Sequence, residues 1–431
     1  MSLIKNKEEL STSPLRKDAL DILEAGLEAI NTEKVLRNKI ILKNGELFID
    51  KNCYVCEHYE RIFFVGIGKC AFEGAKVIED ILGDKLTEGI VLDIKSGVLN
   101  RMKSLVGTHP YPSEQNVLAT KEIKQLVEKA TEKDLILILI SGGGSSLLCD
   151  PFDTDCETIT KITKELTKKG ADIYELNTVR KHLSKIQGGQ LAALAFPAQV
   201  VSLIFSDVVG NDISVIASGP TVIDKTTKED AKNVLEKYEI KSEVSFDVGL
   251  TETPKDSKYF EKVSNILLVT NQDALEAMKE KAESLDYDTK IETDRLSGNA
   301  QEVGKILAKK ELKPKTCLLF GGETTVEVKG DGIGGRNQEV ALSALSDLKD
   351  GVVLISAASD GWDNLDTAGA IIDKETLEKA NLISKNPEDY LSKNDSFNFF
   401  KEVGGHLSTG RTGSNVSDLY ILITNDPNKI E

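Results

Sequence analysis

Long apolar runs, signal-like segments and metal-type cysteine patterns are all missing from this 431-residue sequence. The longest aliphatic run is Leu135–Ile140, far below the ~20 apolar residues that a membrane helix needs, so we expect no membrane anchor. The N-terminus, MSLIKNKEEL, lacks the apolar core of a signal peptide. Both absences predict a cytoplasmic protein.

Cysteine is sparse, and only Cys53 and Cys56 have C-x-x-C spacing among the six cysteines. One such pair cannot complete a four-ligand zinc site. We therefore expect reduced thiols, which fits a reducing compartment.

Positive charge is in deficit, because 54 Lys and Arg face 70 Asp and Glu, giving a net charge of −16. This balance argues against general affinity for nucleic acid or anionic membranes, which needs clustered basic residues. It does not exclude an anionic small substrate, since a basic pocket can lie on an acidic protein. Only eight of the basic residues are Arg, and three of these lie in Gly-, Asn- or Ser-rich segments: Arg180, Arg336 and Arg411. This chain uses Lys for most of its positive charges. An Arg is therefore weak evidence that a planar group able to donate two parallel hydrogen bonds is needed at that position.

Alternating strands and helices predict an α/β fold with a parallel sheet. Apolar strands are expected at 61–67, 89–93, 134–140 and 199–205. A polar stretch with weak periodicity follows, and then a second α/β series begins.

We therefore predict two α/β domains, residues 1–240 and 263–431, joined by a linker at 241–262. A cleft between the two domains is the expected ligand site.

The first candidate loop, Gly66–Ala71, follows a strand, opens a helix and matches G-x-G-x-x-A. With Asp93 at the end of the next strand, this is a weak dinucleotide-binding fingerprint. Lys69 within the turn also suits a phosphate or carboxylate, held by a point charge and backbone N–H groups. Tight packing with a solvated lysine is the structural alternative.

The second candidate loop reads SGGGSS and follows the all-apolar strand 134–140. Its glycines allow close approach to an anion, and its hydroxyls add donors. A turn without function is the alternative.

A third segment places Asn177, Arg180, Lys181 and Ser184 at helical spacing on one polar face, which suits a carboxylate or phosphate. A solvated charged face would give the same pattern. We expect His182 to be structural.

Further candidates lie near predicted strand ends or helix starts. Asp207 follows a buried strand and could hold a metal or accept a proton, or instead cap a helix. Four glycines in residues 330–335 precede Arg336 and a predicted helix, which indicates an anion site. Asp360 follows another strand, Trp362 is expected in the core or in a lid, and His109 is expected to brace a turn.

Phosphate-type loops, cations in both predicted domains and carboxylates near strand ends together suit phosphoryl transfer. That reaction depends on positioned cations and donors more than on covalent chemistry.

The chain resembles the glycerate 2-kinase family, whose C-terminal part is the MOFRL domain. The resemblance runs from about residue 60 to 420 in family order, through GIGKCA, THPYP, SGGGSSLL, LNTVRKHLSKIQGG, SDVVGNDISVIASGPT, GGETTVEVKGDGIGGRNQE, ASDGWDN, NDSFNFF and TGRTGSNVSDL. It implies a Rossmann-like N-terminal domain with a parallel sheet, a smaller C-terminal α/β domain and an active site in the interdomain cleft.

The activity that the resemblance implies is phosphorylation of D-glycerate at its 2-hydroxyl, with ATP and Mg²⁺, to give 2-phosphoglycerate. From the acidic charge balance we expect no nucleic-acid or membrane partner, and a homodimer stays open. Lys69 and Arg336 are expected as catalytic cations, and Asp207 and Asp360 as acidic partners of a metal or the substrate hydroxyl, with Asp207 preferred for the metal. The expected substrate- and phosphate-binding residues are Ser141, Gly142, Gly143, Gly144, Ser145, Ser146, Asn177, Arg180, Glu323, Asn337 and Asn415.

Three departures from the family pattern stand out. Asn211 replaces the usual Asp, Arg411 replaces the usual Pro, and the loop after Asp360, WDNLDTAG, aligns as one residue shorter and less Gly-rich. The asparagine weakens a metal role for position 211, and the arginine changes the local turn and charge. Substrate or nucleotide preference could differ at the loop after Asp360.

Two other functions compete with the kinase. An NAD(P)H-dependent hydroxypyruvate reductase would use G-x-G-x-x-A and Asp93. A non-catalytic sensor of glycerate or nucleotide would bind without turnover, although the retained Lys69, Asp207, Arg336 and Asp360 argue against it.

Overall fold

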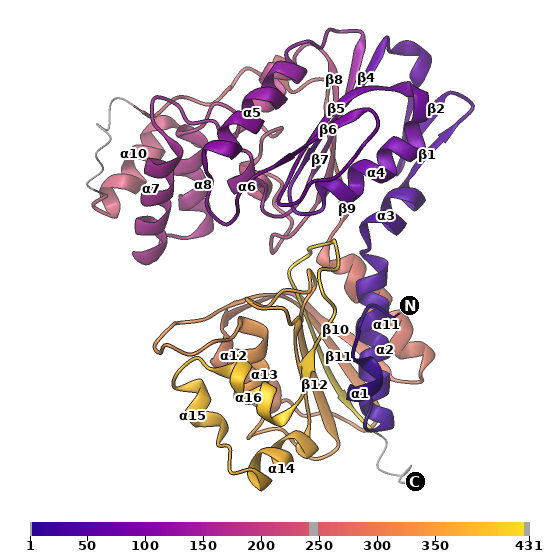
Figure 1. Cartoon of the computed structure of the whole chain (residues 1–431), viewed down its shortest axis with the longest axis vertical. Helices are drawn as coiled ribbons and strands as arrows, with labels where there is room; N and C mark the ends of the chain where they lie inside the picture. The colour runs from indigo at the N-terminus through magenta and orange to yellow at the C-terminus, as the bar shows by residue number, and fades with distance from the viewer. Residues whose placement is uncertain (1, 241–248, 426–431) are drawn as a thin grey trace. The chain divides into compact units, whose positions relative to one another are not determined.

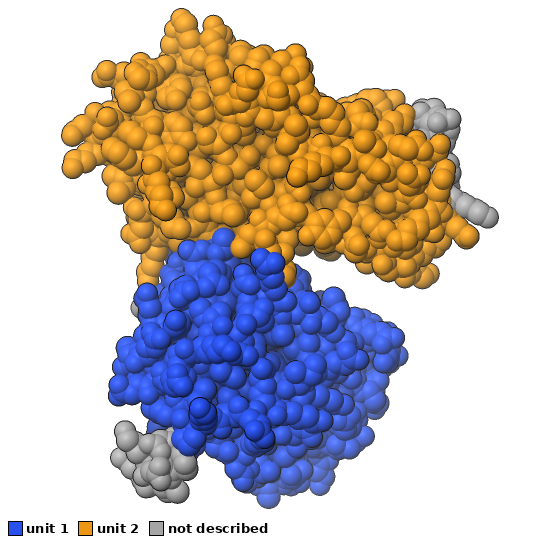
Figure 2. Space-filling view, turned by 180° about the vertical axis from the view of Figure 1, so that it is seen from behind, with its two compact units in different colours: residues 1–31, 270–431 blue, residues 32–269 orange. Residues whose placement is uncertain are grey.

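The computed structural model describes residues 2–240 and 249–425. Close contacts divide the chain into two compact units (Figure 2). Unit 1 consists of residues 1–31 and 270–431, and unit 2 consists of residues 32–269. The described helices do not combine the length and apolar content that a bilayer span requires.

Unit 2 is built on a six-stranded sheet whose paired strands are all parallel. Its order is β6-β5-β4-β7-β8-β9, the Rossmann order, so the direction of winding reverses between β4 and β7. The strands are β4 (Arg61–Ile67), β5 (Leu86–Asp93), β6 (Met102–Val106), β7 (Asp134–Ile140), β8 (Gln199–Phe205) and β9 (Val263–Val269). Every residue of β7 is buried, as its unbroken apolar run after Asp134 predicts.

The remaining elements of unit 2 surround this sheet or form smaller layers (Figure 1). A three-stranded antiparallel sheet contains β1 (Ile40–Lys43), β2 (Glu46–Ile49) and β3 (Asn52–Val55). The helices are α3 (Thr32–Lys39), α4 (Ala71–Leu82), α5 (Glu114–Val127), α6 (Gly144–Leu147), α7 (Cys156–Lys168), α8 (Ile173–His182), α9 (Gln190–Ala195) and α10 (Lys228–Lys237). Short 3₁₀ turns lie at Cys56–His58, Gly83–Lys85, Ile216–Ser218 and Ser257–Tyr259.

Helices α7, α8 and α10 form a separate cluster within unit 2 (Figure 1). Their apolar side chains share a small core that includes Leu166 from α7, Val179 from α8 and Leu235 from α10. This core supports α8, the helix that carries Asn177 and Arg180.

Unit 1 contains a mixed sheet in the order β10-β11-β15-β12-β13-β14. Only the β10–β11 pair is parallel among these neighbours. The strands are β10 (Asp288–Asn299), β11 (Thr316–Thr325), β12 (Val352–Ala358), β13 (Gly369–Ile372), β14 (His406–Leu407) and β15 (Asp418–Thr424).

In Figure 1, α1, α2 and α11 cover one side of the unit 1 sheet, and α12 to α16 lie on the other. The helices are α1 (Lys7–Leu10), α2 (Pro14–Ala29), α11 (Asn271–Ser284), α12 (Ala300–Ala308), α13 (Arg336–Ala344), α14 (Lys374–Leu382), α15 (Pro387–Leu391) and α16 (Ser396–Val403). Their apolar faces share a core with Phe320, Leu354 and Tyr420 of the sheet.

The observed division of the chain differs from the predicted one in two places. Residues 1–31 join unit 1, because α2 buries its apolar face there and Gly26 lies directly against Met278 of α11. Strand β9 joins unit 2 as the sixth parallel strand, paired with β8. Residues 241–248 of the predicted linker lie outside the described residues. Residues 249–262 belong to unit 2, where Thr251 N–H donates to the His182 carbonyl at 2.7 Å.

Candidate functional site

The two candidate loops of unit 2 meet where the strand order reverses, at the ends of β4 and β7. The backbone N–H of Lys69 donates to the Gly142 carbonyl at 3.0 Å, and that of Cys70 donates to Ser141 Oγ at 3.3 Å. Gly68 has φ +115°, and a Cβ there would overlap the backbone of Ser141. The glycine is therefore needed for the two loops to interlock, at the usual ligand-binding position of such sheets.

Gly143 lies beside two long side chains. Its φ is +84°, and a Cβ would lie 3.0 Å from His109 Cδ2 and 3.2 Å from Lys69 Cγ. The missing side chain thus lets Lys69 and His109 approach the loop backbone. Lys69 is half-buried, whereas His109 is exposed.

Hydroxyls of the SGGGSS loop are tied to neighbouring segments. Ser218 Oγ donates to Asn177 Oδ1 at 2.6 Å and lies 3.0 Å from Ser145 Oγ. The Asn177 amide donates to the Ile173 carbonyl at 2.9 Å, and Ser146 Oγ donates to the Pro110 carbonyl at 2.6 Å. The structure therefore brings the predicted Asn177 to the loop. The same contacts give this buried amide a role in holding α8 against the loop.

Arg180 lies on α8 and is half-buried. Within the described part of the chain, its guanidinium has no hydrogen bond or ion pair, and burial lowers its pKa. A partly desolvated cation without a counter-charge is unfavourable, and an anionic ligand would relieve that cost. Arg180 is therefore the strongest anion-binding candidate of unit 2.

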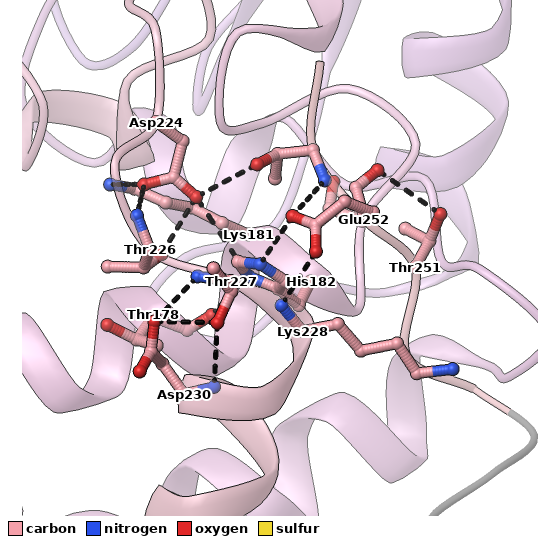
Figure 3. Close-up of polar contacts among 12 residues, drawn as sticks. Thr178, Lys181, His182, Asp224, Thr226, Thr227, Lys228, Asp230, Thr251 and Glu252 are labelled. Atoms are coloured by element: carbon pink, nitrogen blue, oxygen red, sulfur yellow. Dashed lines mark hydrogen bonds and ion pairs between the residues drawn. The ribbon is translucent and has the colours of Figure 1, made fainter. Parts of the chain in front are cut away.

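The four residues of the predicted polar face of α8 differ in their partners, and Figure 3 shows that of Lys181. Lys181 is buried and forms an ion pair with Asp224 at 3.1 Å, so it is not available to a ligand. Ser184 Oγ accepts from the N–H groups of Ile186 and Gln187, both at 3.2 Å. The interpretation of one four-residue anion-binding face is wrong, because helical spacing does not show which side chains turn toward a buried carboxylate.

His182 is structural, as expected. It is fully buried, its Nδ1 lies 3.0 Å from the Thr178 carbonyl, and its Nε2 lies 3.5 Å from Glu252 Oε1 (Figure 3). Burial lowers its pKa, although Asp224 and Glu252 act in the opposite direction.

Asp207 is half-buried just beyond the end of β8. Burial raises the pKa of the Cys70 thiol to about 12, and the carboxylates of Asp93 and Asp207 add to this effect. Asp207 therefore acts electrostatically on the loop that contains Lys69. Asn211 has φ +57°, a conformation that both Asn and Asp tolerate, so its replacement of Asp fits the backbone.

Protein side chains alone do not build a metal centre in the described ranges, where no group of three His, Cys, Asp or Glu could hold an ion. Mg²⁺ commonly takes one or two carboxylates together with substrate phosphates and water. Asp207 beside a glycine-rich loop fits that pattern.

Asp93 does not fit the dinucleotide alternative. It is fully buried, and its two carboxylate oxygens accept from the backbone N–H groups of Phe72 at 3.0 Å and Ile94 at 2.6 Å. A ribose-binding carboxylate must face its ligand. Asp93 instead fixes the start of α4.

In unit 1, Arg336 is held by two carboxylates. Its Nε and Nη2 donate to the buried Asp418 at 2.6 and 3.0 Å, and its Nη1 lies 2.6 Å from Glu323 Oε1. Burial opposes the charge, but these carboxylates raise the pKa of Arg336. Arg336 is thus a fixed cation at the start of α13.

The glycine-rich segment 330–335 does not leave the helix N-terminus open to an anion. Asp363 accepts from the backbone N–H groups of Asn337 at 3.0 Å and Gln338 at 2.8 Å, so its carboxylate already caps α13. Burial raises the pKa of Asp363 to about 6, although these hydrogen bonds oppose the shift. The predicted anion site at this helix start is therefore occupied by the protein's own carboxylate.

Close packing explains the glycines themselves. A Cβ at Gly330 or Gly332 would overlap the Lys393 carbonyl, and one at Gly335 would overlap Asp363. The predicted Asn337 is fully buried, and its Oδ1 accepts from Ser356 Oγ at 2.8 Å. Its side chain thus joins α13 to β12.

Asp360 lies between two loops of unit 1. Its Oδ1 accepts from the Trp362 N–H at 2.9 Å, and its carbonyl accepts from the Thr412 N–H at 3.2 Å. Trp362 is 39% exposed and thus at the surface rather than in the core. Asn415 Oδ1 accepts from the Ser417 N–H at 3.2 Å in the second loop.

Four supporting residues were missed from the sequence: Gln187, Ser218, Asp363 and Asp418. Gln187 Nε2 donates to the carbonyls of Ser145 and Leu148, both at 2.9 Å, and so holds the SGGGSS loop. All four lie in the motifs IQGG, SGPT, GWDN and VSDL. That position in a motif was the only available signal, because nothing in the spacing shows which partner each residue has.

Comparison with known proteins identifies the family of the chain. Residues 18–249 match the family described as "Domain of unknown function (DUF4147)", and residues 316–418 match the MOFRL family. The D-glycerate 2-kinase of Thermotoga maritima is 38% identical over 424 residues, covering 94% of this chain and 98% of that protein. The glycerate 2-kinase of Pyrococcus horikoshii is 38% identical over 445 residues, with the same two coverages, 94% and 98%.

A solved structure is also similar. The crystal structure of glycerate kinase from Thermotoga maritima has a TM-score of 0.83 and 38% identity, covering 95% of this chain and 99% of that chain. The chain belongs to the glycerate 2-kinase family.

Proposed function

We propose that this protein transfers the γ-phosphoryl group of ATP to the 2-hydroxyl of D-glycerate and releases 2-phosphoglycerate and ADP. The observation that supports this most is Arg180, a half-buried guanidinium without an internal partner in the described residues, on the helix joined through Ser218 to the SGGGSS loop. Glycerate and ATP are both anions that such a group can hold.

The roles of the residues follow from the chemistry. Lys69 and Arg336 supply positive charge to the oxygens of the transferred phosphoryl group, which dominates catalysis of this reaction. The backbone of residues 141–146 lines the phosphates. Arg180 holds a carboxylate or phosphate, and Asp360 accepts the proton that leaves the 2-hydroxyl. Glu323, Asn337 and Asn415 support these groups.

Mg²⁺ is proposed as the metal, with Asp207 as its protein ligand. When bound, it would neutralise phosphate charge, which lowers the cost of bringing a hydroxyl to an anionic group. The carboxylate chemistry of Asp207 suits this hard cation.

Arg180→Met tests the supporting observation. An internally unpaired cation contributes little to folding, so the variant should unfold at or above the wild-type temperature. It should also raise the KM of glycerate or ATP by about tenfold or more, since charged hydrogen bonds are worth about 1.5–3 kcal/mol. Wild-type KM values for both substrates would remove Arg180 from the site.

The reductase alternative has its own test. NADH oxidation with hydroxypyruvate would support it, and the buried Asp93 argues against it. Tight binding of glycerate or nucleotide without turnover would instead favour the sensor.

A further inference from the structure

Two side chains from neighbouring loops of unit 1 contact each other. The guanidinium carbon of Arg411 lies 4.0 Å from the ring centroid of Trp362. Arg411 belongs to the loop that precedes β15, and Trp362 belongs to the loop that follows Asp360. The stacked pair lies beside a candidate catalytic carboxylate, because Arg411 Nη1 is 3.9 Å from Asp360 Oδ2.

The loops that carry them are held together by their backbones. Gly361 has φ +77°, and a Cβ there would overlap the Gly410 carbonyl. Thr412 Oγ1 donates to the Ser359 carbonyl at 2.6 Å, and Ser359 Oγ accepts from the Val416 N–H at 2.9 Å. These contacts fix the position of Arg411 relative to Asp360.

The Arg411 donors remain available for a ligand. Within the described residues its only ion pair is with Asp360, where Nη1 and Oδ2 are 3.9 Å apart, beyond hydrogen-bond distance. The side chain is 45% exposed. Arg336 differs, because each of its three guanidinium nitrogens already has a carboxylate partner, Asp418 or Glu323.

A second cation lies close to this loop. A Cβ at Gly410 would overlap the Lys5 ammonium, and the Lys5 N–H donates to the Ser408 carbonyl at 2.7 Å. Lys5 therefore adds positive charge next to the residue that precedes Arg411.

We propose that Arg411, stacked on Trp362, is a substrate-binding residue that holds an anionic oxygen pair beside Asp360. A guanidinium stacked on a ring keeps its N–H edge for two-point contact with a carboxylate or phosphate. The anion is either the hydroxy-acid carboxylate or a nucleotide phosphate. The assignment rests on the proposed phosphoryl transfer and names a further specificity residue for it.

Kinetics of Arg411→Met, Arg411→Lys, Trp362→Leu and Trp362→Phe in the full-length protein test this assignment. Arg411→Met should raise the KM of one substrate by about tenfold while kcat changes much less. The reason is that Arg411 would bind the ground state and the transition state equally well, so its loss weakens substrate binding without slowing the chemical step. Arg411→Lys should recover only part of the loss, and Trp362→Phe should stay nearer to wild type than Trp362→Leu. Arg295→Met is the matched control, since Arg295 is an exposed arginine of unit 1 paired with Asp294.

Equilibrium binding separates the two sources of the anion. Weaker binding of inorganic tripolyphosphate to Arg411→Met identifies a phosphate site, and weaker binding of D-glycerate identifies a carboxylate site. Wild-type KM values and wild-type affinity for both ligands would overturn the assignment. If the wild-type protein does not phosphorylate glycerate, the proposed function fails, and the binding measurements still decide the role of Arg411.

Discussion

Arg336 and Asp418 are joined at two points, Nε to Oδ2 at 2.6 Å and Nη2 to Oδ1 at 3.0 Å. Asp418 is fully buried at the first position of β15, and Arg336 is the first residue of α13. The pair therefore fixes a helix start to a strand start and sets the orientation of the proposed catalytic cation.

Asp418→Asn should weaken both folding and activity. The variant leaves Arg336 hydrogen-bonded to one carboxylate, that of Glu323. We expect the free energy of unfolding to fall by about 2–4 kcal/mol. This is less than for a fully buried ion pair, because the Arg336 side chain is 34% exposed and water screens its charge. Urea unfolding and steady-state kinetics check this. Glu327→Gln, in an exposed pair with Lys329, is the control and should change neither. Wild-type stability for Asp418→Asn would contradict the structural role of the pair.

Lys69→Met and Arg336→Met should each slow turnover by a factor on the order of 10²–10³, about 3–4 kcal/mol in activation free energy. The reason is the loss of positive charge from the transition state. Lys76→Met, which removes an exposed lysine of α4 paired with Glu73, is the matched control for Lys69. A kcat close to wild type would remove the tested residue from the catalytic set.

Gly143→Ala should reduce activity beyond its effect on folding. Its Cβ would press against Lys69 and His109, and its φ of +84° adds about 1–2 kcal/mol of backbone cost. Gly170→Ala has a nearly equal φ of +81° with nothing within 4 Å, so it isolates the backbone cost. Equal kcat/KM in the two variants would show that crowding at Gly143 has no functional effect.

His406 should make stability depend on pH. Burial lowers its pKa to about 4, and its ring stacks on Phe397 with centroids 4.8 Å apart. At pH values between the ordinary pKa of 6.5 and the folded-state pKa of about 4, His406 is protonated in the unfolded chain but not in the folded chain. Unfolding therefore takes up a proton in this range, and the stability of the fold decreases as the pH falls. His406→Phe should lose less stability than wild type between pH 6.5 and 5 in urea titrations. Identical losses would exclude His406 as a source of the dependence.

The centre of the parallel sheet of unit 2 was predictable because β4, β7 and β8 are apolar and buried on both faces. Strands Arg61–Ile67, Asp134–Ile140 and Gln199–Phe205 have the predicted bounds. Strand β10 was missed because it is polar and lies at a sheet edge, where no apolar pattern is required. The domain boundary was misplaced because sequence order does not show that α2 packs on α11.

The candidate site was predictable at the level of motifs, and its internal bonding was not. The interlocking of the Lys69 loop with the SGGGSS loop follows from two neighbouring strand ends. The choice of Asp224 as the partner of Lys181, and of Asp363 as the cap of α13, depends on long-range packing. Runs of glycine were also ambiguous in the sequence, because close packing of the backbone and binding of an anion both require glycine.

The most direct test of the central claim is the position of the new phosphate ester. Purified protein with D-glycerate, ATP and Mg²⁺ would be followed by mass spectrometry and proton-coupled ³¹P NMR. We predict a phosphoglycerate whose phosphorus couples to a single carbon-bound proton, as the 2-phosphate must. Coupling to two protons, as in the 3-phosphate, or no phosphorylated glycerate at all, would contradict the proposed function.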